Sequence, residues 1–258
     1  MNNKIRNIIK KKNKSKIVCL TAYSKNIAEI IDNHVDIILV GDSLGSVLYN
    51  YDTTRKVSLK MMFEHTKSVR MGVKKSLLVI DLPYNTYRNK SEALKNSKKA
   101  IKETKCDAVK IEGGSRVKDI VSHLVKNKIP VLGHIGITPQ TTKGKFKSKG
   151  KTETEKKKLI NDAKVLEQSG AFGIVLECIY SDISKKITNL IKIPTIGIGA
   201  SIHCDGQVLV TDDILGLTNA KIKFVKKYTN IKKIINSAVF KFKQEVKSKK
   251  YPTKKYSY

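Results

Sequence analysis

The feature that most constrains the fold is a short apolar run that recurs seven times, each time followed by a turn and a longer amphipathic stretch. The runs are rich in Val, Ile and Leu and cover residues 16–20, 36–41, 77–82, 107–112, 130–134, 173–177 and 194–199. Runs of this length are typical of strands buried on both faces of a parallel sheet. The stretches at 58–71, 91–105, 116–126, 154–169 and 182–190 have the length of helices. This alternation predicts an α/β protein.

The ends of the predicted strands favour a closed barrel over a doubly wound open sheet. A weaker apolar pattern at 207–210 predicts an eighth strand, and the chain has 258 residues, close to the roughly 250 residues of a (β/α)8 barrel. Five strands end in an acid or a histidine: Asp42, Asp81, Glu112, His134 and Glu177. In a barrel these ends converge on one mouth, whereas an open sheet would spread them along an edge. We therefore expect a single (β/α)8 barrel domain over residues 1–258.

The composition is strongly basic, with 52 Lys and Arg against 22 Asp and Glu and a net charge of +30. Such a charge is typical of nucleic-acid binding. However, nearly all the basic residues are lysines scattered along the chain, whereas specific phosphate and base readers favour arginine. We expect a solvated surface and no nucleic-acid partner.

No segment approaches the ~20 apolar residues of a membrane span, and the first 16 residues lack an apolar signal segment. We expect a cytoplasmic protein without membrane contact.

The carboxylates at the strand ends are candidate metal ligands. Asp42 and Ser43 have an alternative role as caps of a following helix. Glu112 and Glu177 are poor caps, and a carboxylate inside an apolar strand is costly to bury unless it is paired or metal-bound. If Asp42, Asp81 and Glu112 share one barrel mouth, they repel one another unless a cation lies among them. A site made only of oxygen ligands suits Mg²⁺ better than Zn²⁺.

Two basic side chains are expected at the same mouth. Lys110 precedes Glu112 by two positions, so both side chains point to the same face of a strand. An ammonium there is a candidate to bind a substrate carboxylate, and the alternative is a structural ion pair with Glu112. His134 is either a satisfied core histidine or a functional group, and the sequence leaves its role open.

Six motifs closely resemble the ketopantoate hydroxymethyltransferase family (3-methyl-2-oxobutanoate hydroxymethyltransferase). They occur in the family's order and the similarity runs from about residue 16 to the tail. The motifs are VGDSLG at 40–45, DLP at 81–83, VKIEGG at 109–114, GHIGITPQ at 133–140, LEC at 176–178, and IGIGA at 196–200 with DGQ at 205–207.

The resemblance implies a (β/α)8 TIM barrel of the phosphoenolpyruvate/pyruvate type that requires Mg²⁺. It implies the first committed step of pantothenate biosynthesis. In that step a hydroxymethyl group passes from 5,10-methylenetetrahydrofolate to 3-methyl-2-oxobutanoate, which forms 2-dehydropantoate (ketopantoate). Family members are homo-oligomers, often decamers.

The resemblance also assigns residues. It implies that Asp42, Asp81 and Glu112 bind the metal, that Asp42, Ser43, Asp81 and Lys110 contact the keto acid, and that Glu177 is the catalytic base. An α-keto acid chelates Mg²⁺ through its carboxylate and keto oxygens, so the metal stabilises the enolate that forms when the C3 proton leaves. The enolate then attacks the methylene carbon supplied by the folate, and water completes the hydroxymethyl group.

The sequence departs from the family pattern in three places. The loop at 141–150 is about two residues shorter than usual and keeps only Gly144 and Phe146 of its aromatic and glycine pattern. Ser201 replaces a common glycine, and the tail at 251–256 carries lysines where the family has acids. The nearest rival is another Mg²⁺-dependent barrel enzyme that makes or breaks C–C or P–C bonds of keto acids without folate.

Overall fold

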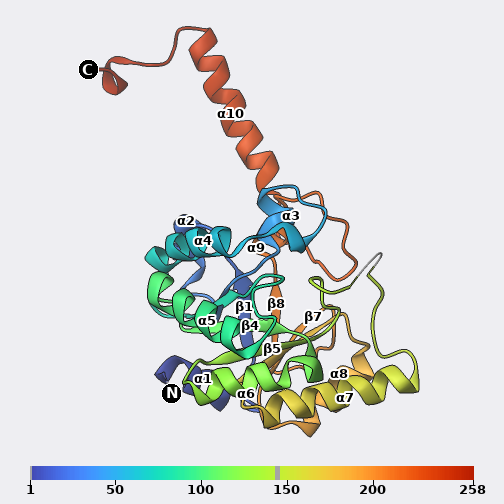
Figure 1. The fold of residues 1–258 in the computed structure, drawn as a ribbon. Coiled ribbons are helices and arrows are strands. Elements are labelled where there is room, and N and C mark those ends of the chain that lie inside the picture. The colour runs from blue at the N-terminus through green and yellow to red at the C-terminus, as the bar shows by residue number, and fades with distance from the viewer. Residues whose placement is uncertain (1, 143–145) are drawn as a thin grey trace. The chain divides into compact units, whose positions relative to one another are not determined.

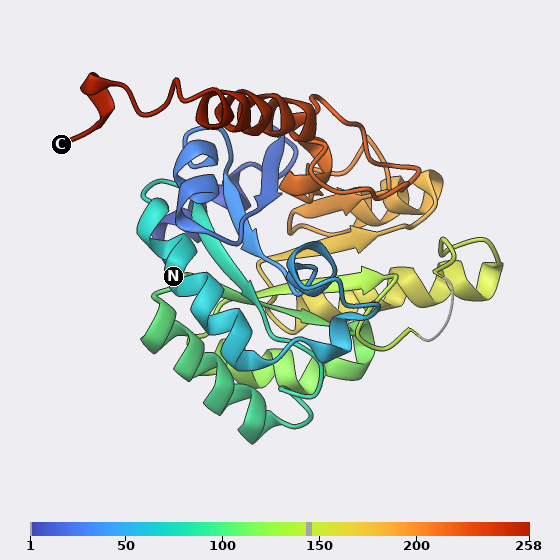
Figure 2. The same cartoon turned by 90° about the horizontal axis from the view of Figure 1, so that it is seen from above.

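Eight parallel strands close into a barrel in chain order, from β1 to β8 (Figures 1 and 2). This computed structural model describes residues 2–142 and 146–258. The strands confirm the predicted barrel and every predicted strand to within two residues. Their bounds are β1 Ile17–Thr21, β2 Ile37–Val40, β3 Leu77–Asp81, β4 Ala108–Glu112, β5 Val131–Gly136, β6 Gly173–Glu177, β7 Thr195–Ile198 and β8 Gly206–Leu209.

Helices follow most of the strands along the chain. The five predicted helices are confirmed as α4 Leu59–Gly72, α5 Lys90–Thr104, α6 Lys118–Lys126, α7 Glu153–Gln168 and α8 Ser181–Leu190. Sequence reasoning missed α1 Asn3–Lys10, α2 Lys25–Ile31 and α3 Leu44–Leu48, and the 3-10 turns η1 Thr54–Lys56 and η2 Gly114–Val117. These elements are short, and a helix of one or two turns carries too few apolar repeats to be recognised.

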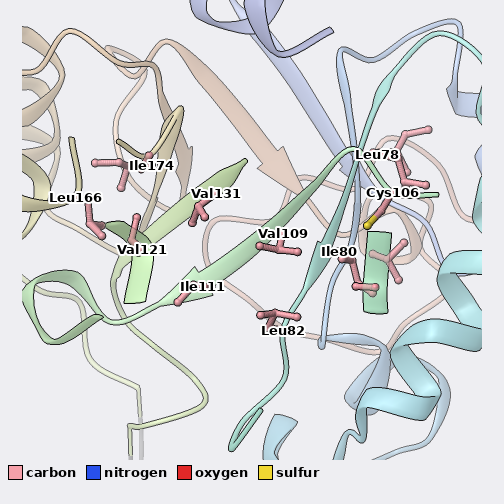
Figure 3. Packing of buried hydrophobic residues seen from close by; sticks show 14 of the residues in the cluster. Leu78, Ile80, Leu82, Cys106, Val109, Ile111, Val121, Val131, Leu166 and Ile174 are labelled. Carbon is pink, nitrogen blue, oxygen red and sulfur yellow. The ribbon is translucent and has the colours of Figure 1, made fainter. Parts of the chain in front are cut away.

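Apolar side chains form two clusters because neighbouring residues of a strand point to opposite faces. Ile38 and Val40 of β2 belong to the cluster between strands and helices, part of which Figure 3 shows. Ile37 and Leu39 belong to the cluster inside the barrel. Helix α1 contributes Ile5 to the inner cluster, so the lysine-rich N-terminal segment has an apolar face that packs against the barrel interior.

An aspartate directly precedes each of the strands β2, β4 and β8. Its side chain reaches the strand that comes one earlier in the chain. In each case Oδ2 accepts a hydrogen bond from a backbone amide of the neighbouring strand. The bonds run from Val18 to Asp36 (2.9 Å), from Leu78 to Asp107 (3.0 Å) and from Thr195 to Asp205 (2.9 Å). We call these three bonds the aspartate ties. They fix the neighbouring strands relative to each other at the end opposite to the barrel mouth.

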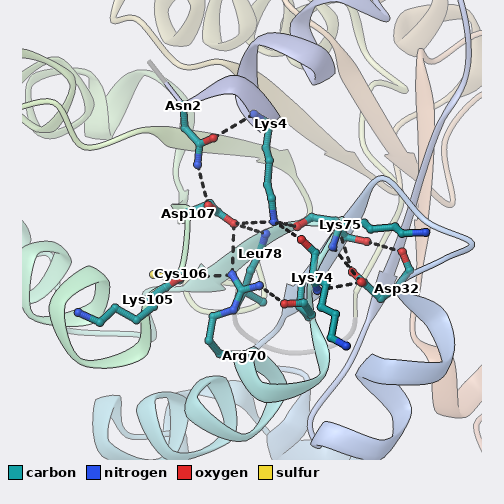
Figure 4. Close-up of polar contacts among 12 residues, drawn as sticks. Asn2, Lys4, Asp32, Arg70, Lys74, Lys75, Leu78, Lys105, Cys106 and Asp107 are labelled. Atoms are coloured by element: carbon teal, nitrogen blue, oxygen red, sulfur yellow. Dashed lines mark hydrogen bonds and ion pairs between the residues drawn. The ribbon is translucent and has the colours of Figure 1, made fainter.

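Asp32 supports the same end of the barrel from the C-terminal end of α2 (Figure 4). Its side chain accepts hydrogen bonds from the backbone amides of Lys74 (2.8 Å), Lys75 (2.9 Å) and Ser76 (2.9 Å). Burial by itself raises the pKa of a carboxyl group, but these amides outweigh it and hold the pKa of Asp32 below its ordinary value. The carboxylate therefore stabilises the turn that leads into β3.

The chain forms two compact units, of which the barrel unit ends at Val210 and the C-terminal unit is Thr211–Tyr258. The C-terminal unit contains α9 Thr211–Ile214, α10 Ile231–Lys247 and the 3-10 turn η3 Lys254–Tyr256. No residue of α10 is buried, although its side chains include Ile234, Val239 and Phe242. The expectation of one domain over 1–258 stays a prediction. Among the described residues, no helix is both long and apolar enough to cross a membrane.

Candidate active site

The five polar residues predicted at strand ends lie at the C-terminal end of the barrel. Asp42 follows β2, Asp81 and Glu112 are the last residues of β3 and β4, His134 lies within β5, and Glu177 ends β6. The first four are almost fully buried, with 1–5% of their surface exposed, and the Glu177 side chain is 21% exposed. The following contacts bring them together at one barrel mouth.

Asp81 and Lys110 form a buried ion pair between neighbouring strands. The β3–β4 register places them side by side, and Lys110 Nζ lies 2.7 Å from Asp81 Oδ2. The same oxygen accepts a hydrogen bond from the backbone amide of Asp42 at 3.1 Å. Asp81 Oδ1 is buried and has no hydrogen-bond partner among the described residues. The ion pair that the structure gives Lys110 is therefore with Asp81, and not with Glu112 as in the alternative considered from sequence.

Asp42 is held in a site that disfavours its charge. Burial and the nearby carboxylates of Asp81 and Glu112 raise the pKa of Asp42 to about 8. Ser43 is the residue before α3, but its side chain makes no capping hydrogen bond. Its Oγ lies 2.8 Å from the hydroxyl of Tyr23 instead. The structure thus contradicts the alternative in which Ser43 caps the helix through its side chain.

His134 lies between two glutamates. Its Nδ1 is 3.3 Å from Glu112 Oε1 and its Nε2 is 3.2 Å from Glu177 Oε2. Neither ring nitrogen has a hydrogen-bond partner among the described residues, so with the imidazole protonated the two contacts are ion pairs. Burial opposes the charge on His134, but the Glu112 carboxylate outweighs it and raises the pKa of the imidazole to about 9. Burial likewise opposes ionisation of Glu112, and the charge of His134 more than offsets it, so the pKa of Glu112 is lowered.

Gly136 lets β5 approach the backbone that carries Glu177. The two residues are paired in the β5–β6 register, and Gly136 has a φ of +102°. A Cβ atom at this position would lie 2.1 Å from the carbonyl oxygen of Glu177. Only glycine fits both the backbone conformation and this close approach.

Gln140 is a site residue to which sequence reasoning gave no role. It is 1% exposed and lies in the loop after β5. Its side-chain Nε2 donates to Asp42 Oδ2 at 2.8 Å, and its backbone amide donates to Glu112 Oε2 at 3.2 Å. Its position at the end of the GITPQ motif was visible in the sequence, but nothing in the spacing showed that it reaches across the mouth.

The residues present fit Mg²⁺ in their chemistry. Asp42, Asp81 and Glu112 supply only oxygen atoms, and the unpartnered Asp81 Oδ1 is the kind of buried atom that a cation would satisfy. Among the described residues, no three His, Cys, Asp or Glu side chains already stand close enough to hold an ion together. Mg²⁺ usually keeps waters and substrate oxygens beside one or two protein carboxylates, so a complete protein cage is not required.

The sequence departures from the family involve none of the residues described above. Gly144 lies outside the described residues, while Phe146 is exposed. Ser201 is buried, and its Oγ lies 2.9 Å from the hydroxyl of Ser181. The lysines of the tail belong to the C-terminal unit. Within the described part of the barrel unit, the hydroxyl of Ser201 makes no hydrogen bond with the carboxylates of the mouth.

Comparison with known proteins adds sequence relatives of the whole chain. A family model described as ketopantoate hydroxymethyltransferase matches residues 2–254. The chain is 62% identical over 258 residues to a 3-methyl-2-oxobutanoate hydroxymethyltransferase of Pelagibacter ubique (strain HTCC1062), with 100% of both proteins covered. It is 47% identical over 240 residues to the enzyme of the same name from Rhizobium etli, covering 92% of this chain and 88% of that protein.

Solved structures resemble the barrel at low sequence identity. A phosphonopyruvate hydrolase in complex with oxalate and Mg²⁺ has a TM-score of 0.60 at 12% identity and covers 99% of this chain and 93% of that one. A 2,3-dimethylmalate lyase of the PEP mutase/isocitrate lyase superfamily has a TM-score of 0.58 at 13% identity, with 81% and 79% covered. These likenesses confirm the predicted type of TIM barrel. By the family match and the full-length relatives, the chain belongs to the ketopantoate hydroxymethyltransferase family and is an enzyme with that activity.

Proposed function

We propose that the enzyme transfers a hydroxymethyl group from 5,10-methylenetetrahydrofolate to 3-methyl-2-oxobutanoate in a reaction that depends on Mg²⁺. Asp42, Asp81 and Glu112 would hold the ion. When bound there, Mg²⁺ would withdraw electron density from the keto acid and stabilise the enolate. The observation that carries this proposal is the buried Asp81 Oδ1, which lacks a partner among the described residues and stands beside two further carboxylates.

The neighbouring residues suit an α-keto acid. Burial opposes the charge on Lys110, but the carboxylates around it, Asp81 above all, raise its pKa. Lys110 therefore stays a cation and can attract a substrate carboxylate. The hydroxyl of Ser43 and the carboxylates of Asp42 and Asp81 line the same end of the barrel and complete the proposed contacts. The solved phosphonopyruvate hydrolase holds oxalate and Mg²⁺, and oxalate presents two adjacent oxygen-bearing carbons as an α-keto acid does.

Glu177 is the proposed base that takes the C3 proton. It lies on β6, away from the carboxylates of β2, β3 and β4, and is more exposed than they are. A base needs to face the carbon of the substrate rather than the ion, and a separate strand provides that position. The contact with His134 holds one oxygen of Glu177, which leaves the other for the proton.

The test of the overall reaction uses the purified protein with Mg²⁺, 3-methyl-2-oxobutanoate and 5,10-methylenetetrahydrofolate. Ketopantoate should form, and it should not form when either the folate or Mg²⁺ is left out. Product without folate would favour the rival enzyme of the same barrel type. Absence of a Mg²⁺ requirement, checked with a chelator and with added metals, would contradict the metal site.

The role of Glu177 is tested by exchange of the C3 proton in D₂O, followed by NMR. The Glu177→Gln variant should still bind the keto acid but lose exchange by about 10²–10⁴-fold, the usual contribution of a general base. The exposed residue Glu153 in α7 provides a matched control, because Glu153→Gln should leave exchange unchanged. Exchange at the wild-type rate in Glu177→Gln would rule out the assigned role.

We also propose that the enzyme is a cytoplasmic homo-oligomer, of decamer size as the family resemblance implies. The exposed apolar side chains of α10 support contacts with other copies. Native mass spectrometry should show a single species of ten copies. A monomer at micromolar concentration would contradict the proposal.

A further inference from the structure

Gln140 is unusual in that each of its polar atoms is used within the barrel mouth. Its Nε2 donates to Asp42 Oδ2 at 2.8 Å and to the carbonyl oxygen of Leu82 at 3.0 Å. Its Oε1 accepts a hydrogen bond from the hydroxyl of Tyr87 at 2.5 Å. Its backbone amide donates to Glu112 Oε2 at 3.2 Å, and its carbonyl oxygen accepts from Arg55 Nε at 2.9 Å.

These bonds fix the orientation of the Gln140 amide. The carbonyl of Leu82 can only accept, so the NH₂ group must face it, and the same group then also faces Asp42. The hydroxyl of Tyr87 donates to the oxygen on the other side of the amide. A flipped amide would place its oxygen against two acceptors, the Asp42 carboxylate and the Leu82 carbonyl. The Gln140 side chain therefore has one favourable orientation.

The position of Gln140 matters because it spans two of the three proposed Mg²⁺ ligands. It holds one oxygen of Asp42, after β2, and one oxygen of Glu112, at the end of β4. Asp81 lies on the strand between them and is held separately by Lys110. With Oδ2 of Asp42 engaged by the amide, Oδ1 is the oxygen left for a cation.

We propose that Gln140 is a positioning residue that sets the Mg²⁺ affinity of the mouth by fixing the Asp42 and Glu112 carboxylates. This inference rests on the proposed Mg²⁺ site. It adds a residue from the loop after β5 that touches neither the ion nor the keto acid. The loop contributes to metal binding through this one side chain and its backbone amide.

The experiment measures binding of Mg²⁺ alone to the full-length protein by isothermal titration calorimetry. Gln140→Met keeps the length of the side chain and removes its side-chain hydrogen bonds, including the one to Asp42, while the backbone amide can still donate to Glu112. We expect the dissociation constant for Mg²⁺ to rise by about tenfold or more, as loss of a hydrogen bond to a charged group implies. The exposed Gln168 of α7 gives the matched control, because Gln168→Met should bind Mg²⁺ as the wild type does.

Turnover provides a second readout that a merely structural role would not change. In Gln140→Met the reaction should be slow at limiting Mg²⁺ and return close to the wild-type rate at saturating Mg²⁺. Tyr87→Phe frees only one side of the amide and should weaken Mg²⁺ binding by a smaller factor than Gln140→Met. It also carries the test if Gln140→Met fails to fold.

The possible results distinguish failure of the Gln140 role from failure of the proposed Mg²⁺ site. If the wild type binds Mg²⁺ and both folded variants bind it equally well, Gln140 has no positioning role even if the variants melt at lower temperature. If the wild type itself does not bind Mg²⁺, the metal site is wrong and the inference falls with it. Weaker Mg²⁺ binding in the variants, with rates rescued by excess Mg²⁺, supports the inference.

Discussion

At the N-terminal end of the barrel, Asp32 accepts hydrogen bonds from three backbone amides, whereas at the mouth Asp81 keeps one buried oxygen without a partner among the described residues. The pKa values of Asp32 and Asp42, one acid from each end, also shift in opposite directions. The amides around Asp32 outweigh its burial and lower its pKa, while burial and like charges raise that of Asp42 to about 8. Both ends bury acids, but of those compared, hydrogen bonds compensate fully for burial only at Asp32.

The difference teaches how to separate structural from functional carboxylates. A buried acid with saturated hydrogen bonds stabilises the fold, because amide dipoles replace the water that it loses. A buried acid that repels its neighbours destabilises the fold unless a ligand arrives. Four variants that compare the two ends test this rule.

The largest effect is expected at the mouth. Asp81→Asn removes the charge next to the proposed Mg²⁺ and should lower kcat/KM by about 10²–10³-fold, the usual loss when one group that stabilises developing charge is removed. Stability without metal should fall, because the buried Lys110 loses its charged partner. The loss is reduced because the amide oxygen still accepts from Lys110 and repulsion with Asp42 is relieved. Steady-state kinetics and chemical denaturation check both parts, and wild-type kinetics in this variant would contradict the assignment.

The next effect concerns stability at the opposite end. Asp32→Asn places an NH₂ group against backbone donors and should lower the free energy of unfolding by about 2–4 kcal/mol. The kcat of the folded variant should stay unchanged because Asp32 is far from the mouth. The exposed Glu29 on the same helix supplies the control, since Glu29→Gln should leave stability as it is. A loss of kcat in folded Asp32→Asn would contradict a purely structural role for Asp32.

The pH dependence of stability should have opposite signs at the two ends. Without metal, the folded pKa of Asp42 is about 8, above the unfolded value of about 3.9. Its contribution to stability is therefore present below the unfolded pKa and lost as the pH rises toward 8. The lowered pKa of Asp32 gives a contribution that is present above about pH 3.9 and lost as the pH falls through the folded value.

Denaturation curves in a chelator measure this contrast. The free energy of unfolding of the wild type should fall relative to that of Asp42→Asn as the pH rises from about 4 to 8. This difference in stability should shrink when Mg²⁺ is added. The difference in free energy of unfolding between the wild type and Asp32→Asn should instead shrink below about pH 4. A flat difference curve for Asp42→Asn would contradict the raised pKa.

The smallest effect is expected at a single aspartate tie. Asp36 accepts one backbone hydrogen bond from Val18 and pairs with Lys11, so Asp36→Ala should cost about 1 kcal/mol of stability. The surface acid Asp52 forms an exposed ion pair with Lys56, and the control variant Asp52→Ala should show no measurable change. A loss for Asp36→Ala as large as that of Asp32→Asn would mean that the number of hydrogen bonds does not set the contribution.

The sequence predicted the barrel and the positions of Asp42, Asp81, Glu112 and Glu177, because strand ends in a parallel barrel must meet at one mouth. It could not predict that Lys110 pairs with Asp81, because that contact depends on the register between two strands. Strand alternation gave only the face on which Lys110 lies.

The contacts of Gln140 and the helix α10 were missed for different reasons. Gln140 reaches Asp42 across 98 residues of sequence, and such a side-chain contact leaves no periodic pattern. Helix α10 has a clear helical range at Ile231–Lys247, but its apolar residues lie among many lysines and follow a segment without strands. The functional roles of the site residues remain predictions that the variants above test.

The aspartate ties align neighbouring strands at the N-terminal end of the barrel, whereas the proposed active site lies at the other end. Side chains at the mouth can be replaced through evolution without shifting one strand against the next. Solved barrels with 12–13% identity to this chain share its fold and bear the names of a hydrolase and a lyase, as expected where one barrel scaffold carries different sites at its mouth. In this barrel, the bonds that align neighbouring strands and the side chains proposed for the chemistry therefore lie at opposite ends.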